Sequence, residues 1–133
     1  MKLAIKKAQS SIEFFVLVGV VLFFFVTFLL AIQTNIADNV KRKIEISARD
    51  TALGIQDEIA LATASSDGYV RNFIVSNNIE GIDYDINSIE GSVYLRMDGV
   101  NYAIALPVFN VTGDVMKGDN LIRKVNGAVY LNS

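Results

Sequence analysis

Hydrophobic residues are distributed very unevenly along this chain of 133 residues. No residue is charged over the nineteen positions from Phe14 to Ile32. A helix of that length rises roughly 28 Å, close to the thickness of the hydrocarbon core of a bilayer. The apolar region of a secretory signal peptide is shorter, about 7–15 residues, and ends at a small-residue cleavage site. No such site follows Ile32, so the pattern predicts a spanning helix that stays in the mature protein.

The apolar pattern continues beyond Ile32 with the period of an amphipathic helix. Apolar residues recur at three- and four-residue steps and form one stripe, which consists of Ile36, Val40, Ile44, Ala48, Ala52, Ile55, Ile59 and Ala62. No proline interrupts this stripe, and Ser65-Ser66-Asp67-Gly68 supplies a stop, with Gly68 as a left-handed cap. We therefore predict one helix from about Ser11 to Ser65, roughly 80 Å long at about 1.5 Å per residue.

After Gly68 the period changes to two, which is typical of β-strands. Apolar residues alternate on both sides of Asp98-Gly99, a dipeptide that favours a two-residue type I′ turn. Such a turn would pair Met97 with Val100, Leu95 with Tyr102, and Val93 with Ile104. Asn126-Gly127 repeats the signal between residues 121–125 and 128–131. These patterns predict an α+β protein, in which a small antiparallel β head packs on the C-terminal half of the helix because it buries little core alone.

Composition argues against several classes of function. The net charge is −2 and no long basic run occurs, so nucleic acid is not an expected partner. The absence of cysteine excludes disulfides and thiolate ligands, and the absence of histidine removes the commonest general base and metal ligand. Asp83-Tyr-Asp85-Ile-Asn87 resembles the start of a calcium loop, but Ser88 and Tyr94 stand where that loop needs glycine and an acid. We expect no enzyme activity, metal or cofactor.

The most specific pattern lies at the start of the apolar run. A basic leader is followed there by Gln9-Ser-Ser-Ile-Glu-Phe14. This segment resembles that of archaeal type IV pilin-like proteins with a class III signal peptide, whose pattern is Gln-x-Ser-x-Glu-Phe. The matching positions are Gln9, Ser11, Glu13 and Phe14, and the leader charge comes from Lys6 and Lys7. The resemblance implies that a prepilin-type membrane peptidase cuts between Ala8 and Gln9.

The resemblance also implies a structural role, as a pilin or pilin-like subunit that polymerises with its own kind through the N-terminal helix. The precursor would lie in membrane lipid with its N-terminus in the cytoplasm and its head outside, and the mature chain in an extracellular filament. A pilus assembly ATPase and a membrane platform protein would be further partners. The α-amine of Gln9 would pair with Glu13 of an adjacent subunit. The implied organisation is a cleaved leader at residues 1–8, a long helix at 9–66 and an extracellular β-rich head at 67–133. Within the helix, residues 14–32 form the membrane and filament-core segment and residues 33–66 the amphipathic segment.

Three alternatives remain open at this point. Ser10 and Glu13 have the spacing of a capping box, in which Ser10 is the N-cap and Glu13 serves only its own helix end. The chain could be a single-span anchor that displays a β binding module at the cell surface. It could also be a minor pilin or an adhesin at the tip of a filament. Separately, Asn110-Val-Thr112 is the only sequon for N-glycosylation and lies in the head.

Overall fold

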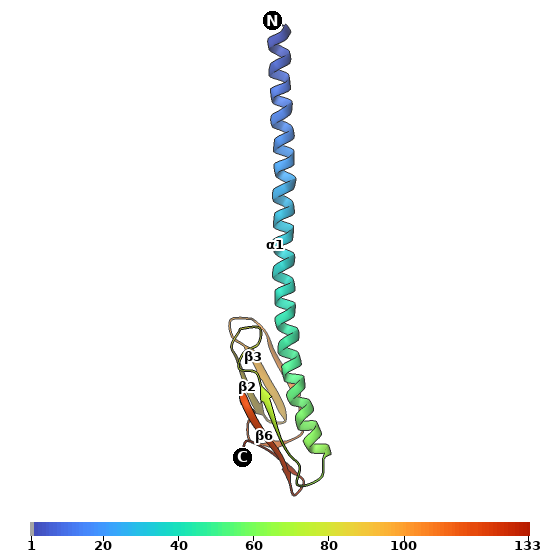
Figure 1. Cartoon of the computed structure of the whole chain (residues 1–133), viewed down its shortest axis with the longest axis vertical. Coiled ribbons are helices and arrows are strands. Elements are labelled where there is room, and N and C mark those ends of the chain that lie inside the picture. The colour runs from blue at the N-terminus through green and yellow to red at the C-terminus, as the bar shows by residue number, and fades with distance from the viewer. Residues whose placement is uncertain (1) are drawn as a thin grey trace. The chain divides into compact units, whose positions relative to one another are not determined.

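The computed structural model describes the backbone of residues 2–133 and the side chains of residues 10–133. The chain divides into two compact units, Met1–Lys41 and Arg42–Ser133. One helix, α1 (Lys2–Ala64), contributes to both units. The predicted α+β class is confirmed, because the chain after α1 forms β-sheets that pack on the C-terminal half of this helix (Figure 1).

The helix begins earlier than predicted. Its first residue is Lys2, whereas the sequence pattern placed the start near Ser11. The leader contains no proline or glycine, and most of its residues are lysine, alanine and leucine, which are good helix formers. Ser10 therefore lies inside α1, and the capping box predicted for Ser10 and Glu13 is wrong for the uncleaved chain, because an N-cap residue stands outside the helix.

The C-terminal end of α1 lies close to its predicted position but is capped differently. Gly68 has a positive φ of 91°, yet it stands in a turn beyond the helix, where its N–H donates to the carbonyl of Lys124 at 2.9 Å. The cap comes from the Lys124 side chain, whose Nζ donates to the carbonyls of Thr63 (2.6 Å) and Ser65 (2.8 Å). A cation at this position satisfies orphan carbonyls and faces the negative end of the helix dipole.

The head contains two sheets. The four-stranded sheet has the order β1-β6-β7-β5, with β1 (Val70–Val75), β6 (Gly118–Val125), β7 (Ala128–Leu131) and β5 (Val111–Thr112). The three-stranded sheet has the order β2-β3-β4, with β2 (Tyr84–Ile89), β3 (Ser92–Met97) and β4 (Ala103–Pro107). All neighbours are antiparallel except β5 and β7, where Val111 pairs in parallel with Val129.

The two predicted turns have different outcomes. Asn126 and Gly127 both have positive φ, and Val125 pairs with Ala128, as a type I′ turn requires. The register predicted around Asp98-Gly99 is wrong by two residues, since Leu95 pairs with Ile104 and Val93 with Leu106. Of this dipeptide only Gly99 has a positive φ, so the connection is longer and closes where the Met97 N–H donates to the Tyr102 carbonyl at 3.0 Å. A shift of two keeps every side chain on its predicted face.

Two further tight turns are formed by Glu-Gly dipeptides. Glu90-Gly91 joins β2 to β3 with φ angles of 41° and 77°. Glu80-Gly81 has φ angles of 52° and 78° and lies inside the bridge between Ile79 and Ile82. Both glutamates adopt a left-handed conformation that costs a non-glycine residue roughly 1–2 kcal/mol.

The core of the head is built partly by the helix. From Ile44 to Ala62 the predicted stripe is buried, and it packs in one cluster with buried strand residues that include Tyr84, Leu95, Ile122 and Leu131. Ile36 and Val40 continue the stripe but are 58% and 53% exposed. The second half of the helix therefore belongs structurally with the head, within the unit Arg42–Ser133.

Candidate processing and assembly segment

The residues of the processing motif all lie on α1. Lys6, Lys7, Ala8 and Gln9 have helical backbone, and their side chains are outside the described residues. The predicted cleavage bond between Ala8 and Gln9 is therefore inside a helix. Ser11, Glu13 and Phe14 follow on the same helix with exposed side chains. Gln9 and Glu13 are four residues apart, so they share one helical face.

The apolar segment behind the motif is exposed on every side. Each large apolar side chain from Ile12 to Ile32, except the half-buried Val18, is at least 38% exposed. An 18-residue window of this helix has a mean hydropathy of 3.1 with none of it buried, and α1 is the one helix within residues 10–133 that is long and apolar enough to cross a membrane. A helix that is apolar all round is stable in lipid or in the interior of a larger assembly.

Polar side chains within and just after this segment bond the backbone of their own helix. Thr27 Oγ1 donates to the Phe23 carbonyl at 2.8 Å. Asn35 Nδ2 donates to the Ala31 carbonyl at 2.8 Å, and the Thr34 hydroxyl donates to the same oxygen at 2.9 Å. Because the hydroxyl protons of Thr27 and Thr34 and one amide N–H of Asn35 are bonded inside the helix, these donors need no other partner in an apolar environment.

Just beyond the exposed segment, a pair of hydrogen-bonded charges joins α1 to the head. Lys43 Nζ lies 2.9 Å from Glu80 Oε2, and the Ser47 hydroxyl donates to Glu80 Oε1 at 2.9 Å. The hydrogen bond from Lys43, followed by the one from Ser47, lowers the pKa of the Glu80 carboxyl. These contacts fix the Glu80-Gly81 turn against the helix.

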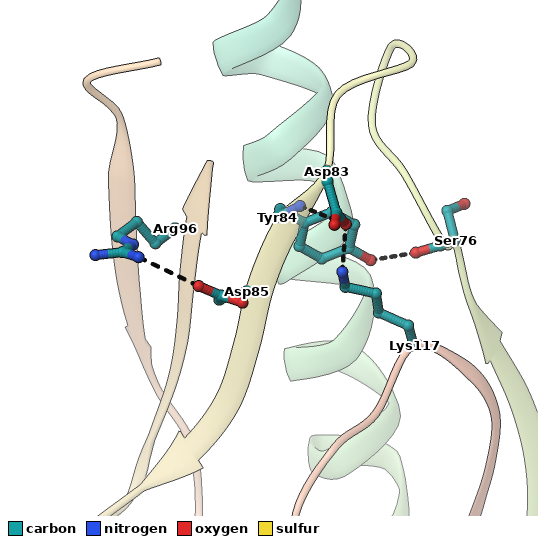
Figure 2. Close-up of polar contacts among 6 residues, drawn as sticks. All are labelled: Ser76, Asp83, Tyr84, Asp85, Arg96 and Lys117. Carbon is teal, nitrogen blue, oxygen red and sulfur yellow. Dashed lines mark hydrogen bonds and ion pairs between the residues drawn. The ribbon is translucent and has the colours of Figure 1, made fainter. Parts of the chain in front are cut away.

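A second cluster of polar contacts, made by Ser76, Asp83, Tyr84 and Lys117, holds the start of β2 in place (Figure 2). Tyr84 is buried, and its hydroxyl donates to the carbonyl of Ser76. Lys117 Nζ donates to Asp83 and also lies 4.9 Å from the centre of the Tyr84 ring. The bond from Lys117 lowers the pKa of Asp83, while burial raises the pKa of Tyr84. The bond between Asp83 and Lys117 therefore joins the segment that precedes β2 to the segment that precedes β6.

Two of the residues with a weak resemblance to a calcium loop, Asp83 and Asp85, bond basic side chains. Asp83 bonds Lys117, whereas Asp85 pairs across the sheet with Arg96 at 3.3 Å (Figure 2). Asp85 and Asn87 are exposed and Ile86 is half-buried, which confirms the alternation expected of a strand with one wet face. Among the described residues no cluster of three or more acidic side chains could hold a metal ion.

One buried side chain that the sequence pattern did not single out, Asn120, holds the backbone of the segment that leads into β6. Asn120 is 2% exposed, and its Oδ1 accepts bonds from the Met116 N–H and from Asn132 Nδ2, both at 2.8 Å. Its Nδ2 donates to the carbonyls of Met116 (2.7 Å) and Gly118 (3.0 Å). The alternation of β6 places position 120 on the buried face, and that is the only signal the sequence offers.

Comparison of the chain with protein-family models, with curated proteins and with solved structures gives no match.

Proposed function

We propose that this chain is the precursor of a structural subunit of an archaeal type IV pilus-like surface filament, polymerised through the N-terminal half of α1. The observation that carries the proposal is the exposure of almost every apolar side chain from Ile12 to Ile32, directly behind the Gln9–Phe14 motif. Burial of apolar surface is worth about 25 cal/mol per Å². A surface of this extent therefore favours an environment without water, which would be lipid for the precursor and a bundle of like helices for the mature chain. Side-chain packing and polar contacts, rather than hydrophobic burial, would drive the step from lipid to the bundle, because lipid tails are as apolar as these side chains.

An α-helix suits transfer between these two environments. Its backbone hydrogen bonds are internal in both, so no polar backbone group is left without a partner during the move. Thr27, the polar side chain within the span, is likewise bonded to its own helix. The helix can therefore leave lipid for protein contacts without refolding.

Removal of the leader prepares the chain for assembly. Lys6 and Lys7 would each cost about 2.5–3.5 kcal/mol in an apolar environment on insertion scales. Hydrolysis of the Ala8–Gln9 bond removes them as water adds to the Ala8 carbonyl, which leaves a carboxylate on Ala8 and an α-amine on Gln9. Since the bond lies in a helix, the end of α1 must unwind locally to enter the peptidase.

Cleavage also creates a new charge beside Glu13. The α-amine of Gln9 has a reference pKa of about 7.7–8.0, and it stands at the positive end of the helix dipole. Glu13 is one turn further along, at the edge of the apolar segment, where an unpaired carboxylate is costly. A pair between this amine and Glu13 of the adjacent subunit neutralises both groups and sets the axial register. Its value is chiefly specificity, because a buried pair roughly offsets its own desolvation.

The proposal is tested by Glu13→Gln in cells that carry the filament machinery. We expect the variant to insert and to be cleaved, but to give about tenfold fewer filaments than the unmodified chain, since glutamine cannot neutralise the amine. Asp57→Asn is the matched control, because it makes the same charge change at an exposed position of the same helix. Filaments are counted by electron microscopy, and insertion and cleavage are followed by mass spectrometry of the membrane fraction.

The main alternative, a single-span anchor that displays a β binding module, uses the same exposed helix but gives Glu13 no role. In that case Glu13→Gln would behave like Asp57→Asn, and no filament would contain the chain. A minor pilin or tip adhesin would respond to Glu13→Gln as a filament subunit does, but would be present at a few copies per filament rather than along the shaft. Counting chains per filament length by quantitative mass spectrometry separates these two roles.

A further inference from the structure

The sequon in the head lies on an accessible surface loop. Asn110 follows β4 through the irregular segment 108–110, and Thr112 ends the short edge strand β5. Both side chains are exposed. Neither the Asn110 amide nor the Thr112 hydroxyl has a hydrogen-bond partner among the described side chains and backbone. An enzyme that modifies Asn110 would therefore have no hydrogen bond of these two groups to break.

The backbone on both sides of Asn110 is held in place. On one side, the Val108 N–H donates to the carbonyl of Gly91 at 2.8 Å. On the other, Val111 pairs with Val129. The Asn110 side chain lies over Gly91, where a Cβ would come within 3.3 Å of Asn110 Oδ1. A fixed backbone with a free amide is a suitable presentation for an acceptor, because binding then orders few additional groups.

We propose that Asn110 is the acceptor of an N-linked oligosaccharide, which rests on the proposed function because the head must reach the outer side of the membrane. The donor is a sugar carried on a lipid phosphate, and the enzyme is a membrane transferase that recognises the Thr112 hydroxyl. The Asn110 amide nitrogen attacks C1 of the sugar and forms a C–N bond. The C1–O bond to phosphate breaks, the lipid phosphate leaves, and the amide proton passes to a base of the transferase.

The surface beside Asn110 suits an attached sugar. Phe109 is 61% exposed and lines a shallow hollow of about 430 Å³ between α1 and the end of β4. The Gln56 side chain spans one side of this hollow, with Nε2 donating to the carbonyl of Pro107 at 2.6 Å. An oligosaccharide of several residues on Asn110 would be long enough to extend over this exposed aromatic side chain of the neighbouring residue.

The test is mass spectrometry of the full chain purified from the cells that produce it, with peptide mapping of the segment around Asn110. We expect this peptide to carry a mass of several sugar residues, and Asn110→Gln and Thr112→Ala to remove it completely. Asn101→Gln is the matched control, since Asn101 is exposed but no hydroxyl stands two residues after it. Thr112→Ser should retain the modification and so separates recognition of the hydroxyl from a change in folding.

An unmodified Asn110 in the purified wild-type chain would overturn this proposal. The same sample also gives the mature N-terminus, which tests the filament role independently. A chain that begins at Gln9 with bare Asn110 would refute glycosylation and leave the filament role standing. A glycosylated chain that keeps its leader would support glycosylation and contradict processing as a pilin.

Discussion

Replacing Ile59 by alanine tests whether the C-terminal half of α1 is part of the core of the head. Ile59 is fully buried among head residues. The change removes three carbon atoms, which at about 0.8 kcal/mol each gives roughly 2.4 kcal/mol for lost burial. The cavity adds to this value, and measured isoleucine-to-alanine changes cost about 2–5 kcal/mol. We expect the free energy of unfolding to fall by about 3–4 kcal/mol, a large share of the stability of a domain of this size.

Leu61→Ala is the matched control, because Leu61 lies on the same helix, loses the same number of carbons and is 44% exposed. We expect it to cost less than about 1 kcal/mol. The assay is urea denaturation of residues 42–133, the compact unit that contains the head, followed by circular dichroism in the far ultraviolet and in the tyrosine band. Equal losses for the two variants would refute the inference that α1 completes the core of the head.

Two further predictions concern the head. A Cβ at position 113 would lie 1.9 Å from the Leu131 carbonyl oxygen, at a φ of 102°, so Gly113→Ala should lower the free energy of unfolding by about 3 kcal/mol or more. Gly127→Ala, at a φ of 79° with open space, should lower it by about 1 kcal/mol, and a similar loss for both would refute the steric argument. Folding lowers the pKa values of Glu80 and Asp83 from their ordinary values of 4.5 and 3.8. Both carboxylates therefore stabilise the folded state above these ordinary values, and this stabilisation is lost as the pH falls through the lowered pKa values of the folded state. The urea midpoint should therefore drop between pH 6 and pH 3, and Glu80→Gln should reduce that drop; an unchanged drop would contradict the role of Glu80.

Local patterns predicted the features that depend on local physics. The long helix follows from an uninterrupted 3.6-residue period without proline, and the stripe from Ile44 to Ala62 is buried as its spacing requires. The Asn126-Gly127 turn was predictable because both residues tolerate a positive φ. The segment from Gln9 to Phe14 could be singled out because its pattern is contiguous in the sequence, and its role in processing stays a prediction.

Features that depend on distant residues could not be read in the same way. Lys124 caps a helix that ends sixty residues earlier, and no pattern links it to Thr63. The loop after β3 is closed by a bond to Tyr102, so its length depends on the pairing with β4 rather than on the Asp-Gly dipeptide. The turn at Glu90-Gly91 was missed because glutamate is not among the residues that favour a positive φ.

The central claim is that α1, freed of its leader, forms the core of a filament. The most direct measurement is the N-terminal residue of this chain in purified surface filaments, read by Edman degradation or mass spectrometry and compared with the chain in the membrane fraction. We predict that chains in filaments begin at Gln9, as glutamine or its cyclised form, and that uncleaved precursor is confined to the membrane. Filaments built from chains that still carry Lys6 and Lys7, or the absence of this chain from any filament, would contradict the account.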